Sequence, residues 1–251
     1  RVIFDFRQED IKNNGQGAPL TPIFHNLISK YINKKNQILF PIGFINIGGI
    51  SNITKVLEAN GNIEENIEAF DSGPGNCLID EWIRINSKQK FDNNGLIAQS
   101  GKIDQLILNQ AIDNFEIQSY NKSLDIKNFD TSFARGLSLE DGCATITSFT
   151  AYLIAKGIEY SNKDKSKNIK YLICGGGRKN NFLINCIKDY SSNQTNISLD
   201  IIDNYKYDGD YIESQAFGYL AIRSFLNLPI SFPKTTGCNK PTVGGKMVEN
   251  Y

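Results

Sequence analysis

The sequence predicts an α/β fold, with a mixed sheet that has an antiparallel three-stranded start and is flanked by helices. Three short apolar runs, residues 42–47, 53–57 and 67–70, are separated by a glycine pair and by a second turn at 59–62, which is the pattern of consecutive β-hairpins. Longer segments downstream carry apolar residues at helical spacing, and residues 171–174 read as a buried strand that ends at three glycines.

The segment before this sheet predicts a strand, a loop and a helix. Residues 1–6 alternate apolar and polar side chains, and residues 15–20 form a loop punctuated by glycine and proline. Apolar residues at helical spacing predict a helix over 21–32, which ends in a run of asparagine and lysine. We place a candidate boundary after this run, between residues 1–36 and residues 37–251.

A helix follows the three strands, and strands and helices then alternate. In residues 76–86, Leu78, Ile79, Trp82 and Ile83 fall on one face, as packing against a sheet requires. A strand that runs into a glycine-rich turn and a helix, as at residue 174, recurs in nucleotide sites. The remaining predicted elements are helices at 103–115, 140–160, 180–190 and 210–226 and strands at 171–174 and 197–202.

Composition and charge disfavour several classes of function. The 251 residues are 40% apolar, which suffices for an ordinary core, and 27 basic residues balance 27 acidic ones. A chain without net charge has no global field to attract nucleic acid or an anionic membrane, so we expect neither as a partner. No apolar run is long enough to span a bilayer, and the first residues lack the regions of a signal peptide.

The cysteines and the histidine narrow the chemistry further. The five cysteines are odd in number and widely spaced, without a Cys-x-x-Cys pair, so we expect reduced thiols and a cytoplasmic protein. His25 is the only histidine, and the sequence contains no Gly-x-Ser-x-Gly elbow. A Ser-His-Asp triad and a polyhistidine metal site are therefore disfavoured.

Asp71 is the first candidate catalytic residue. Residues 69–76 read Ala-Phe-Asp-Ser-Gly-Pro-Gly-Asn after a predicted strand, so we expect Asp71 at a strand end beside a flexible loop. The sheet would aim the carboxylate, and Gly73 and Gly75 would let backbone amides approach a ligand closely. A capping aspartate in an ordinary turn fits the same residues.

Two further glycine segments are candidate phosphate or nucleoside contacts. Gly48 and Gly49 join two predicted strands and can present backbone amides to a phosphate, although a plain hairpin turn would look the same. The run Gly175, Gly176 and Gly177 lacks both the Gly-x-Gly-x-x-Gly spacing and the Lys-Ser/Thr of a P-loop. Three glycines can let an adenine or a ribose lie against the main chain, and a structural turn is the alternative.

Six motifs in one order give the sequence a family resemblance. They are Asp5-Phe6-Arg7 with Asp10, residues 15–20, 46–52 and 70–76, Cys174-Gly175-Gly176-Gly177, and Glu213 before Ala216-Phe217. Together they resemble the anhydro-N-acetylmuramic acid kinases, which are sugar kinases of the actin, hexokinase and heat-shock ATPase superfamily. The resemblance runs from residue 1 to about residue 245, and it implies an actin-like ATPase (ribonuclease H-like) lobe.

The resemblance also implies roles for residues and ligands. Asp71 would be the catalytic base, Arg7, Asp10 and Glu213 would face the sugar, and the glycine segments would hold the nucleotide and its phosphates. The enzyme would use ATP and Mg²⁺ to hydrolyse the 1,6-anhydro bond and phosphorylate O6 in cell-wall recycling, as a homodimer; the metal ligands are unknown. Charge alone explains Arg7 and Asp10 as surface ion-pair partners and Glu213 as a helix cap.

The sequence departs from the family in two places. Residues 122–129 read Lys-Ser-Leu-Asp-Ile-Lys-Asn-Phe where the family carries Lys-Ser-Thr-Gly-x-Glu-x-Phe, so no contact of this loop is predicted. By this resemblance, the first residue of the chain also corresponds to an internal position of the family sequence, so we expect the N-terminal lobe to be largely missing. Residues 1–36 would end the first lobe and residues 37–251 would form the second. On this hypothesis the strand at 1–6 pairs with strands that the sequence does not supply.

Two other functions stay open at this point. A non-catalytic ligand-binding or scaffolding relic would keep the fold without turnover, which the truncated start and the altered loop at 122–129 favour. A hydrolase or phosphatase of the same superfamily would use Asp71 and a bound water without phosphoryl transfer to a sugar.

Overall fold

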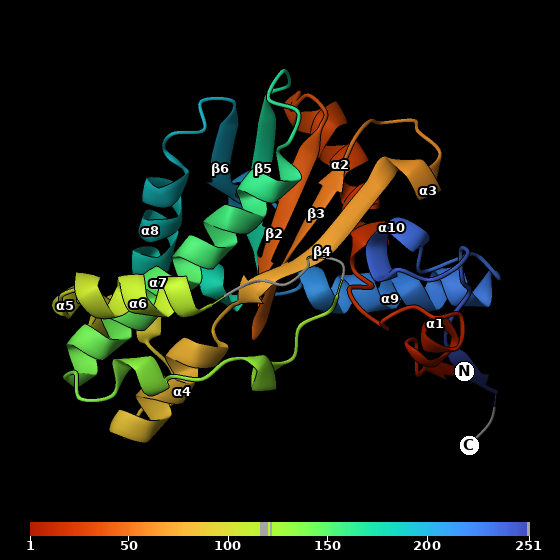
Figure 1. Cartoon of the computed structure of the whole chain (residues 1–251). Helices are drawn as coiled ribbons and strands as arrows, with labels where there is room; N and C mark the ends of the chain where they lie inside the picture. The colour runs from red at the N-terminus through yellow and green to blue at the C-terminus, as the bar shows by residue number, and fades with distance from the viewer. Residues whose placement is uncertain (116–119, 121, 250–251) are drawn as a thin grey trace.

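The computed structural model describes residues 1–115, 120 and 122–249 and centres on a five-stranded sheet of order β4-β3-β2-β5-β6 (Figure 1). β2 (Ile42–Ile47), β3 (Ile50–Val56) and β4 (Ile67–Pro74) are antiparallel neighbours. β5 (Ile169–Cys174) runs parallel to β2, and β6 (Ile197–Ile201) runs parallel to β5. The predicted mixed sheet with an antiparallel start is confirmed.

Helices cover both faces of this sheet. α4 (Cys77–Asn86), α7 (Leu139–Ser161) and α8 (Asn181–Ser191) pack on one face, and α2 (Pro22–Asn36) and α9 (Ile212–Phe225) pack on the other. In Figure 1, α7 crosses in front of the strands and α2 lies behind them. The result is a lobe of three layers, which buries both faces of its central strands.

The two-residue period of a strand explains how β2 serves both layers. Ile45 and Ile47 are fully buried in the core shared with α4 and α7, whereas Ile42 and Phe44 are fully buried in the core shared with α2 and α9. This near-continuous apolar run is typical of a strand covered on both faces. The strand therefore has no solvent face, and only its ends can reach a ligand.

The N-terminal residues form a strand and two helices. β1 (Val2–Phe4) is followed by α1 (Gln8–Lys12), and α2 then enters the core of the sheet through Phe24, Ile28 and Ile32. These three side chains follow helical spacing, so they share one face of α2. The boundary after residue 36 stays a prediction, and α2 already packs with the larger part of the chain.

β1 has a strand partner within the chain. It pairs antiparallel with β7 (Lys246–Val248), with Val2 opposite Val248 and Phe4 opposite Lys246. The expectation that this strand is unpaired within the chain is therefore wrong, and its pairing with strands outside the sequence stays a prediction. A three-residue strand carries too little periodicity to be found from sequence, and only the fold brings the two chain ends together (Figure 1).

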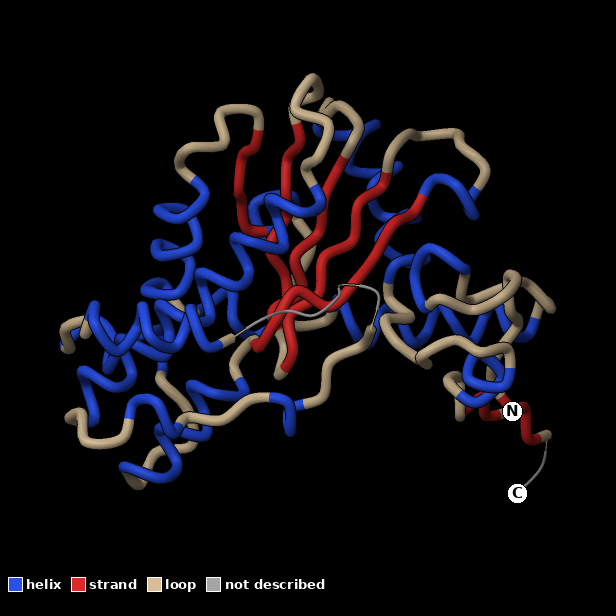
Figure 2. Tube along the Cα trace, in the orientation of Figure 1, coloured by secondary structure: helices blue, strands red, loops and turns tan. Residues whose placement is uncertain are grey.

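The remaining elements are short and lie around the sheet, whose strands run side by side in Figure 2. The predicted turn at 59–62 leads into a short helix, residues 63–66, that the sequence pattern did not predict. Within the described residues, no helix combines the length and the apolar character needed to cross a membrane. The other helices are α3 (Ile63–Asn66), α5 (Leu96–Ser100), α6 (Gln105–Asn114) and α10 (Pro233–Thr236).

Candidate active site

Three neighbouring strands change from apolar to polar side chains at the same level of the sheet. The register pairs Asn46 of β2 with Asn52 of β3, and it pairs Asn52 with Asp71 of β4. Residues directly opposite each other on paired strands point to the same face. Asn46 follows Phe44 by two positions, so this face is the one that α2 and α9 cover. The three side chains therefore form one polar row beside these helices.

Asp71 lies inside β4 and not at its end. The strand continues to Pro74, and the register with β3 shifts between Ser51 and Asn52, which marks a β-bulge. The expected flexible loop after Asp71 is therefore wrong, because the Ser-Gly-Pro segment is itself strand. A bulge bends a strand locally and re-aims one side chain, and here it lies at the position of the candidate carboxylate.

The carboxylate of Asp71 is buried but keeps polar contacts. Its side chain is 7% exposed, and Oδ2 accepts a hydrogen bond from the backbone N–H of Leu124 at 2.8 Å. Burial raises the pKa of Asp71, while the Leu124 hydrogen bond and the positive charge of Arg7 act in the opposite direction. A carboxylate with a raised pKa binds a proton more readily, which is the property of a general base.

Asp71 opens into a cleft of about 490 Å³. Arg7, Gly48, Gly49 and Glu213 line the same cleft, although they come from three separate parts of the chain. Arg7 precedes α1, the glycine pair joins β2 to β3, and Glu213 lies in the first turn of α9. The structure thus brings together five of the residues that the sequence singled out.

Asp10 lies outside the residues that line the cleft. It is fully buried, and its carboxylate accepts hydrogen bonds from the backbone N–H of Gly17 at 2.7 Å and from Oγ1 of Thr236 at 2.6 Å. Gly15 packs so closely that a Cβ there would lie 2.1 Å from Asp10 Oδ2. Asp10 therefore holds the loop at 15–20. Five residues of this loop line the cleft: Gln16, Gly17, Ala18, Pro19 and Leu20.

Four of the candidate glycines are required by close packing. A Cβ would lie 3.0 Å from Leu153 at Gly73, 2.2 Å from the carbonyl oxygen of Gly48 at Gly75, and 2.2 Å from Ile47 at Gly177. Gly175 has a φ of +79°, and a Cβ there would lie 2.6 Å from Asn46 Oδ1. Internal packing explains these glycines without a ligand.

The other three candidate glycines face open space. A Cβ at Gly48 or Gly49 would make only ordinary contacts of 3.5 Å or more, and a Cβ at Gly176 would lie 3.8 Å from Asn76 Nδ2. Packing does not explain why these positions lack a side chain. Gly48, Gly49 and Gly176 are therefore the glycines at which a ligand could lie against the main chain.

The loop at 122–129 contacts the cleft through its backbone. The N–H of Leu124 reaches Asp71, and the hydroxyl of Ser123 donates to the carbonyl of Ala18 at 3.1 Å. The backbone N–H of Ser123 also donates to Gln16 Oε1. Leu124 replaces the family threonine, and its contact with Asp71 needs no particular side chain. This contact is thus compatible with the altered sequence of the loop.

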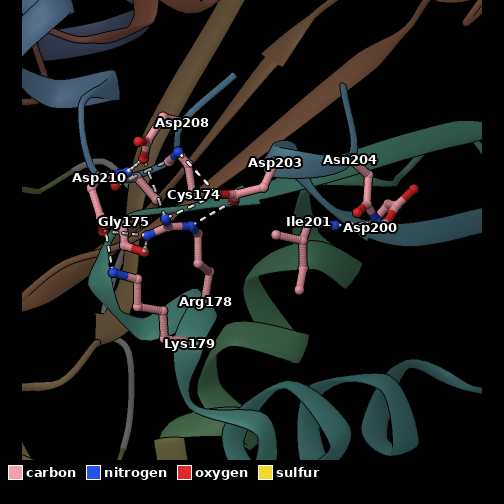
Figure 3. A network of polar contacts seen from close by, with 12 residues as sticks. Cys174, Gly175, Arg178, Lys179, Asp200, Ile201, Asp203, Asn204, Asp208 and Asp210 are labelled. Carbon is pink, nitrogen blue, oxygen red and sulfur yellow. Dashed lines mark hydrogen bonds and ion pairs between the residues drawn. The ribbon is translucent and has the colours of Figure 1, made fainter. Parts of the chain in front are cut away.

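Arg178 fixes the turn after the three glycines (Figure 3). Its side chain is 4% exposed, and it donates from Nε to Asp203 Oδ2 and from Nη1 to Asp210 Oδ1, both at 2.7 Å. Nη1 also donates to the carbonyl of Gly175 at 3.1 Å. The sequence did not predict this network, since its arginine and its acidic residues at 203, 208 and 210 are far apart in the chain. The Arg178 network joins the turn after β5 to the segment before α9.

Asp71 also borders a second cavity, of about 560 Å³, beside the outer edge of β4. Phe70, Tyr120 and Tyr160 line its wall, with the ring centroid of Phe70 5.0 Å from that of Tyr120 and 5.1 Å from that of Tyr160. The two cavities share five lining residues: Gln16, Ala18, Pro19, Asp71 and Ser123. Among the described residues, no cluster of three or more histidine, cysteine or acidic side chains could hold a metal ion.

Comparison with known proteins gives a consistent result. Residues 1–250 match the family described as anhydro-N-acetylmuramic acid kinase. A relative of that name from Pelagibacter ubique (strain HTCC1062) is 52% identical over 100% of this chain and 65% of its own length. One from Brucella canis is 37% identical over 98% of this chain and 64% of its own length. The chain thus spans slightly less than two thirds of these relatives.

Among solved structures, the activator of the 2-hydroxyisocaproyl-CoA dehydratase from Clostridium difficile with bound ADPNP is similar with a TM-score of 0.41 and 15% identity. The similarity covers 77% of this chain and 67% of that chain. The family match, in contrast, extends over nearly every residue of the sequence and agrees with the six ordered motifs. The chain therefore belongs to the anhydro-N-acetylmuramic acid kinase family.

Proposed function

We propose that the protein to which this chain belongs is an ATP-dependent anhydro-N-acetylmuramic acid kinase. It would hydrolyse the 1,6-anhydro bond of the sugar and phosphorylate O6, giving N-acetylmuramic acid 6-phosphate. The observation that carries this proposal is the buried Asp71 carboxylate, whose pKa is raised by burial and which opens into a cleft shared with Arg7 and Glu213. The family match supports the choice of substrate.

In this reaction Asp71 acts as the general base. A water molecule attacks the anomeric carbon C1, Asp71 accepts the proton of that water, and the bond from C1 to the bridging O6 breaks. O6 takes the electron pair of that bond and attacks the γ-phosphorus of ATP, whose bond to the β-phosphate oxygen breaks to release ADP. The proton later passes from Asp71 to solvent. No covalent enzyme intermediate is needed.

We infer that the sugar lies against Arg7 and Glu213 and that the triphosphate lies against the open glycines. Gly48 and Gly49 leave room for phosphate oxygens close to the main chain, and Gly176 leaves room for the nucleoside. Asp10 supports the sugar side through the loop at 15–20. Gly73, Gly75, Gly175 and Gly177 support these segments by packing.

ATP would bind with Mg²⁺, which neutralises phosphate charge in such reactions. A nucleotide-bound Mg²⁺ typically takes most of its ligands from phosphate and water. We assign no residue of this chain as its ligand. We further propose a cytoplasmic homodimer in peptidoglycan recycling, with residues 1–36 as the end of one lobe and 37–251 as the other.

A coupled assay tests this proposal directly. ADP release from ATP would be measured with anhydro-N-acetylmuramic acid, first with this chain and then with the chain completed by the part of the Pelagibacter ubique relative that it does not cover. We expect phosphorylation of the sugar by the completed protein. Binding of both ligands without turnover would instead favour the non-catalytic relic, and ATP-independent opening of the anhydro bond would favour the hydrolase.

A further inference from the structure

Asn52 carries a buried polar atom that has no partner. Its Oδ1 is shielded from solvent and finds no hydrogen-bond partner among the residues that the structure describes. Asn52 also lines the cleft and stands directly opposite Asp71 across β3 and β4. Burying such an acceptor without a hydrogen bond is unfavourable, so a bound molecule is expected to satisfy it.

The neighbouring polar groups in the row already have partners. Asn46 Oδ1 is contacted by the thiol of Cys174 at 3.7 Å, and Oδ2 of Asp71 accepts from the N–H of Leu124. The hydrogen bond to Leu124 uses one oxygen of Asp71 and leaves Oδ1 for another donor. The cleft therefore contains two adjacent acceptors, Oδ1 of Asp71 and Oδ1 of Asn52, which face the same side of the sheet.

The reaction proposed above needs two such acceptors. A water molecule that attacks carbon must direct a lone pair at C1, and both of its hydrogens are then held by other groups. A single carboxylate oxygen binds one hydrogen and leaves the water free to rotate about that bond. A second fixed acceptor removes this freedom, and such positioning contributes substantially to the rate.

We propose that Asn52 is the second acceptor for the attacking water and holds it beside Asp71. This inference rests on the proposed function. One hydrogen of the water is donated to Asp71, which takes it as a proton during attack, and the other is donated to Oδ1 of Asn52, which keeps it as a hydrogen bond. Asn52 is therefore a positioning residue that touches the reacting water and accepts no proton.

The backbone geometry fits this arrangement. Directly opposite residues on antiparallel strands have Cβ atoms about 4.5–5.5 Å apart. Hydrogen bonds of water to oxygen are about 2.7–2.8 Å long, so one water can bridge two acceptors at that spacing. The bulge follows directly after this pair: Asn52 lies opposite Asp71, Ser51 lies opposite Gly73, and Ser72 is the extra residue of β4.

The first test is structural and independent of turnover. A high-resolution crystal structure of this chain is expected to show an ordered water within hydrogen-bond distance of both Asp71 Oδ1 and Asn52. Well-ordered Asp71 and Asn52 side chains without a shared water would overturn the proposal.

The second test uses three variants of the completed protein. Asn52→Leu removes the acceptor at nearly constant volume, and kcat is expected to fall about 10- to 100-fold while KM for ATP and for the sugar stays within about twofold. Thr54→Val is the matched control, since Thr54 lies two residues further on the same face of β3 and its Oγ1 bonds His25 Nδ1 at 2.9 Å, outside the cleft lining. It is expected to lower stability and leave kcat unchanged.

Asn52→Asp separates positioning from a purely structural role. A carboxylate only accepts hydrogen bonds, so this variant is expected to retain more activity than Asn52→Leu at high pH. The added negative charge disfavours ionisation of Asp71 and raises its pKa. The acid limb of kcat should therefore move to higher pH.

The outcomes distinguish the two proposals. An inactive wild-type completed protein would overturn the proposed function and this inference with it. An active wild type whose Asn52→Leu variant keeps full kcat would overturn the role of Asn52 alone. An unshifted pH profile in Asn52→Asp would also count against it.

Discussion

Nη1 of Arg178 donates a hydrogen bond to Oδ1 of Asp210 at 2.7 Å and thereby joins the turn after β5 to the segment before α9. The turn contains Gly176, and the first turn of α9 contains Glu213. Arg178 therefore fixes the position of the nucleoside segment relative to the helix that we assign to the sugar side (Figure 3).

We predict that Arg178→Met lowers thermal stability by about 2–8 °C, because it removes a buried guanidinium and leaves Asp203 and Asp210 close together without their shared cation. Lys179→Met is the matched control. Lys179 also pairs with Asp210, but it is exposed, and exposed pairs contribute little. Thermal denaturation followed by circular dichroism compares the two. Equal melting temperatures for both variants would contradict the prediction.

The same pair predicts a dependence of stability on pH. Hydrogen bonds from Arg178 and then Lys179 lower the pKa of Asp210 to about 2. In the unfolded chain the pKa of an aspartate is about 3.9. The ionised Asp210 therefore stabilises the fold fully above that pH, and this stabilisation is lost as the pH falls towards 2. We expect the difference in stability between wild type and Arg178→Met to shrink over this range in denaturant titrations. A difference that is constant with pH would contradict this account.

We predict that Asp71→Asn lowers kcat at least about 100-fold, because the amide keeps the shape of the carboxylate but cannot accept the proton. The same change should stabilise the fold at neutral pH. Burial raises the folded pKa of Asp71 above its unfolded value, so stability associated with the protonated form is present at low pH and is lost as the pH rises through the folded pKa. Asparagine stays uncharged at neutral pH, so the variant does not lose this stability.

Turnover and thermal melts of the completed protein at neutral and acidic pH check both parts. A variant with nearly the wild-type rate would make Asp71 a structural residue. A variant with a lower melting temperature at neutral pH would mean that the contacts of the carboxylate outweigh its burial.

Gly176 and Gly177 are adjacent but should respond differently to a side chain. Gly176→Val fills open space beside the main chain, so it should weaken ATP binding more than sugar binding while the fold is preserved. Gly177→Ala would place its Cβ 2.2 Å from Ile47 and should lower the free energy of unfolding by about 1–3 kcal/mol. Calorimetric titration of each ligand and denaturant unfolding separate the effects. Equal weakening of both ligands by Gly176→Val would indicate misfolding.

Asp10→Asn tests whether Asp10 acts through the loop at 15–20. Asparagine has one acceptor oxygen where aspartate has two, because its amide nitrogen cannot accept a hydrogen bond. It cannot replace both contacts of the carboxylate, so the free energy of unfolding should fall by about 1–3 kcal/mol. The KM for the sugar should rise because the loop lines the cleft, while kcat changes little. Lost sugar affinity with unchanged stability would instead indicate direct contact with the sugar.

The sequence by itself determined the layered fold and several of the residues in the cleft. Strand and helix periodicity places the sheet and its helices, since side-chain alternation depends only on local backbone geometry. The predicted strand at 42–47 has the observed bounds, and the helix at 76–86 begins one residue late in the structure. The ordered motifs around Arg7, Asp71 and Glu213 indicated residues that prove to line one cleft.

Tertiary structure alone decided which polar groups are buried, paired or left open. The bulge opposite Asn52 depends on how two strands pair, and the partner of β1 lies more than 240 residues away in β7. Glycines that look alike in sequence divide into packed and open positions only when their neighbours are known. Register, burial and close packing arise from contacts between distant segments, and local periodicity carries no information about those contacts.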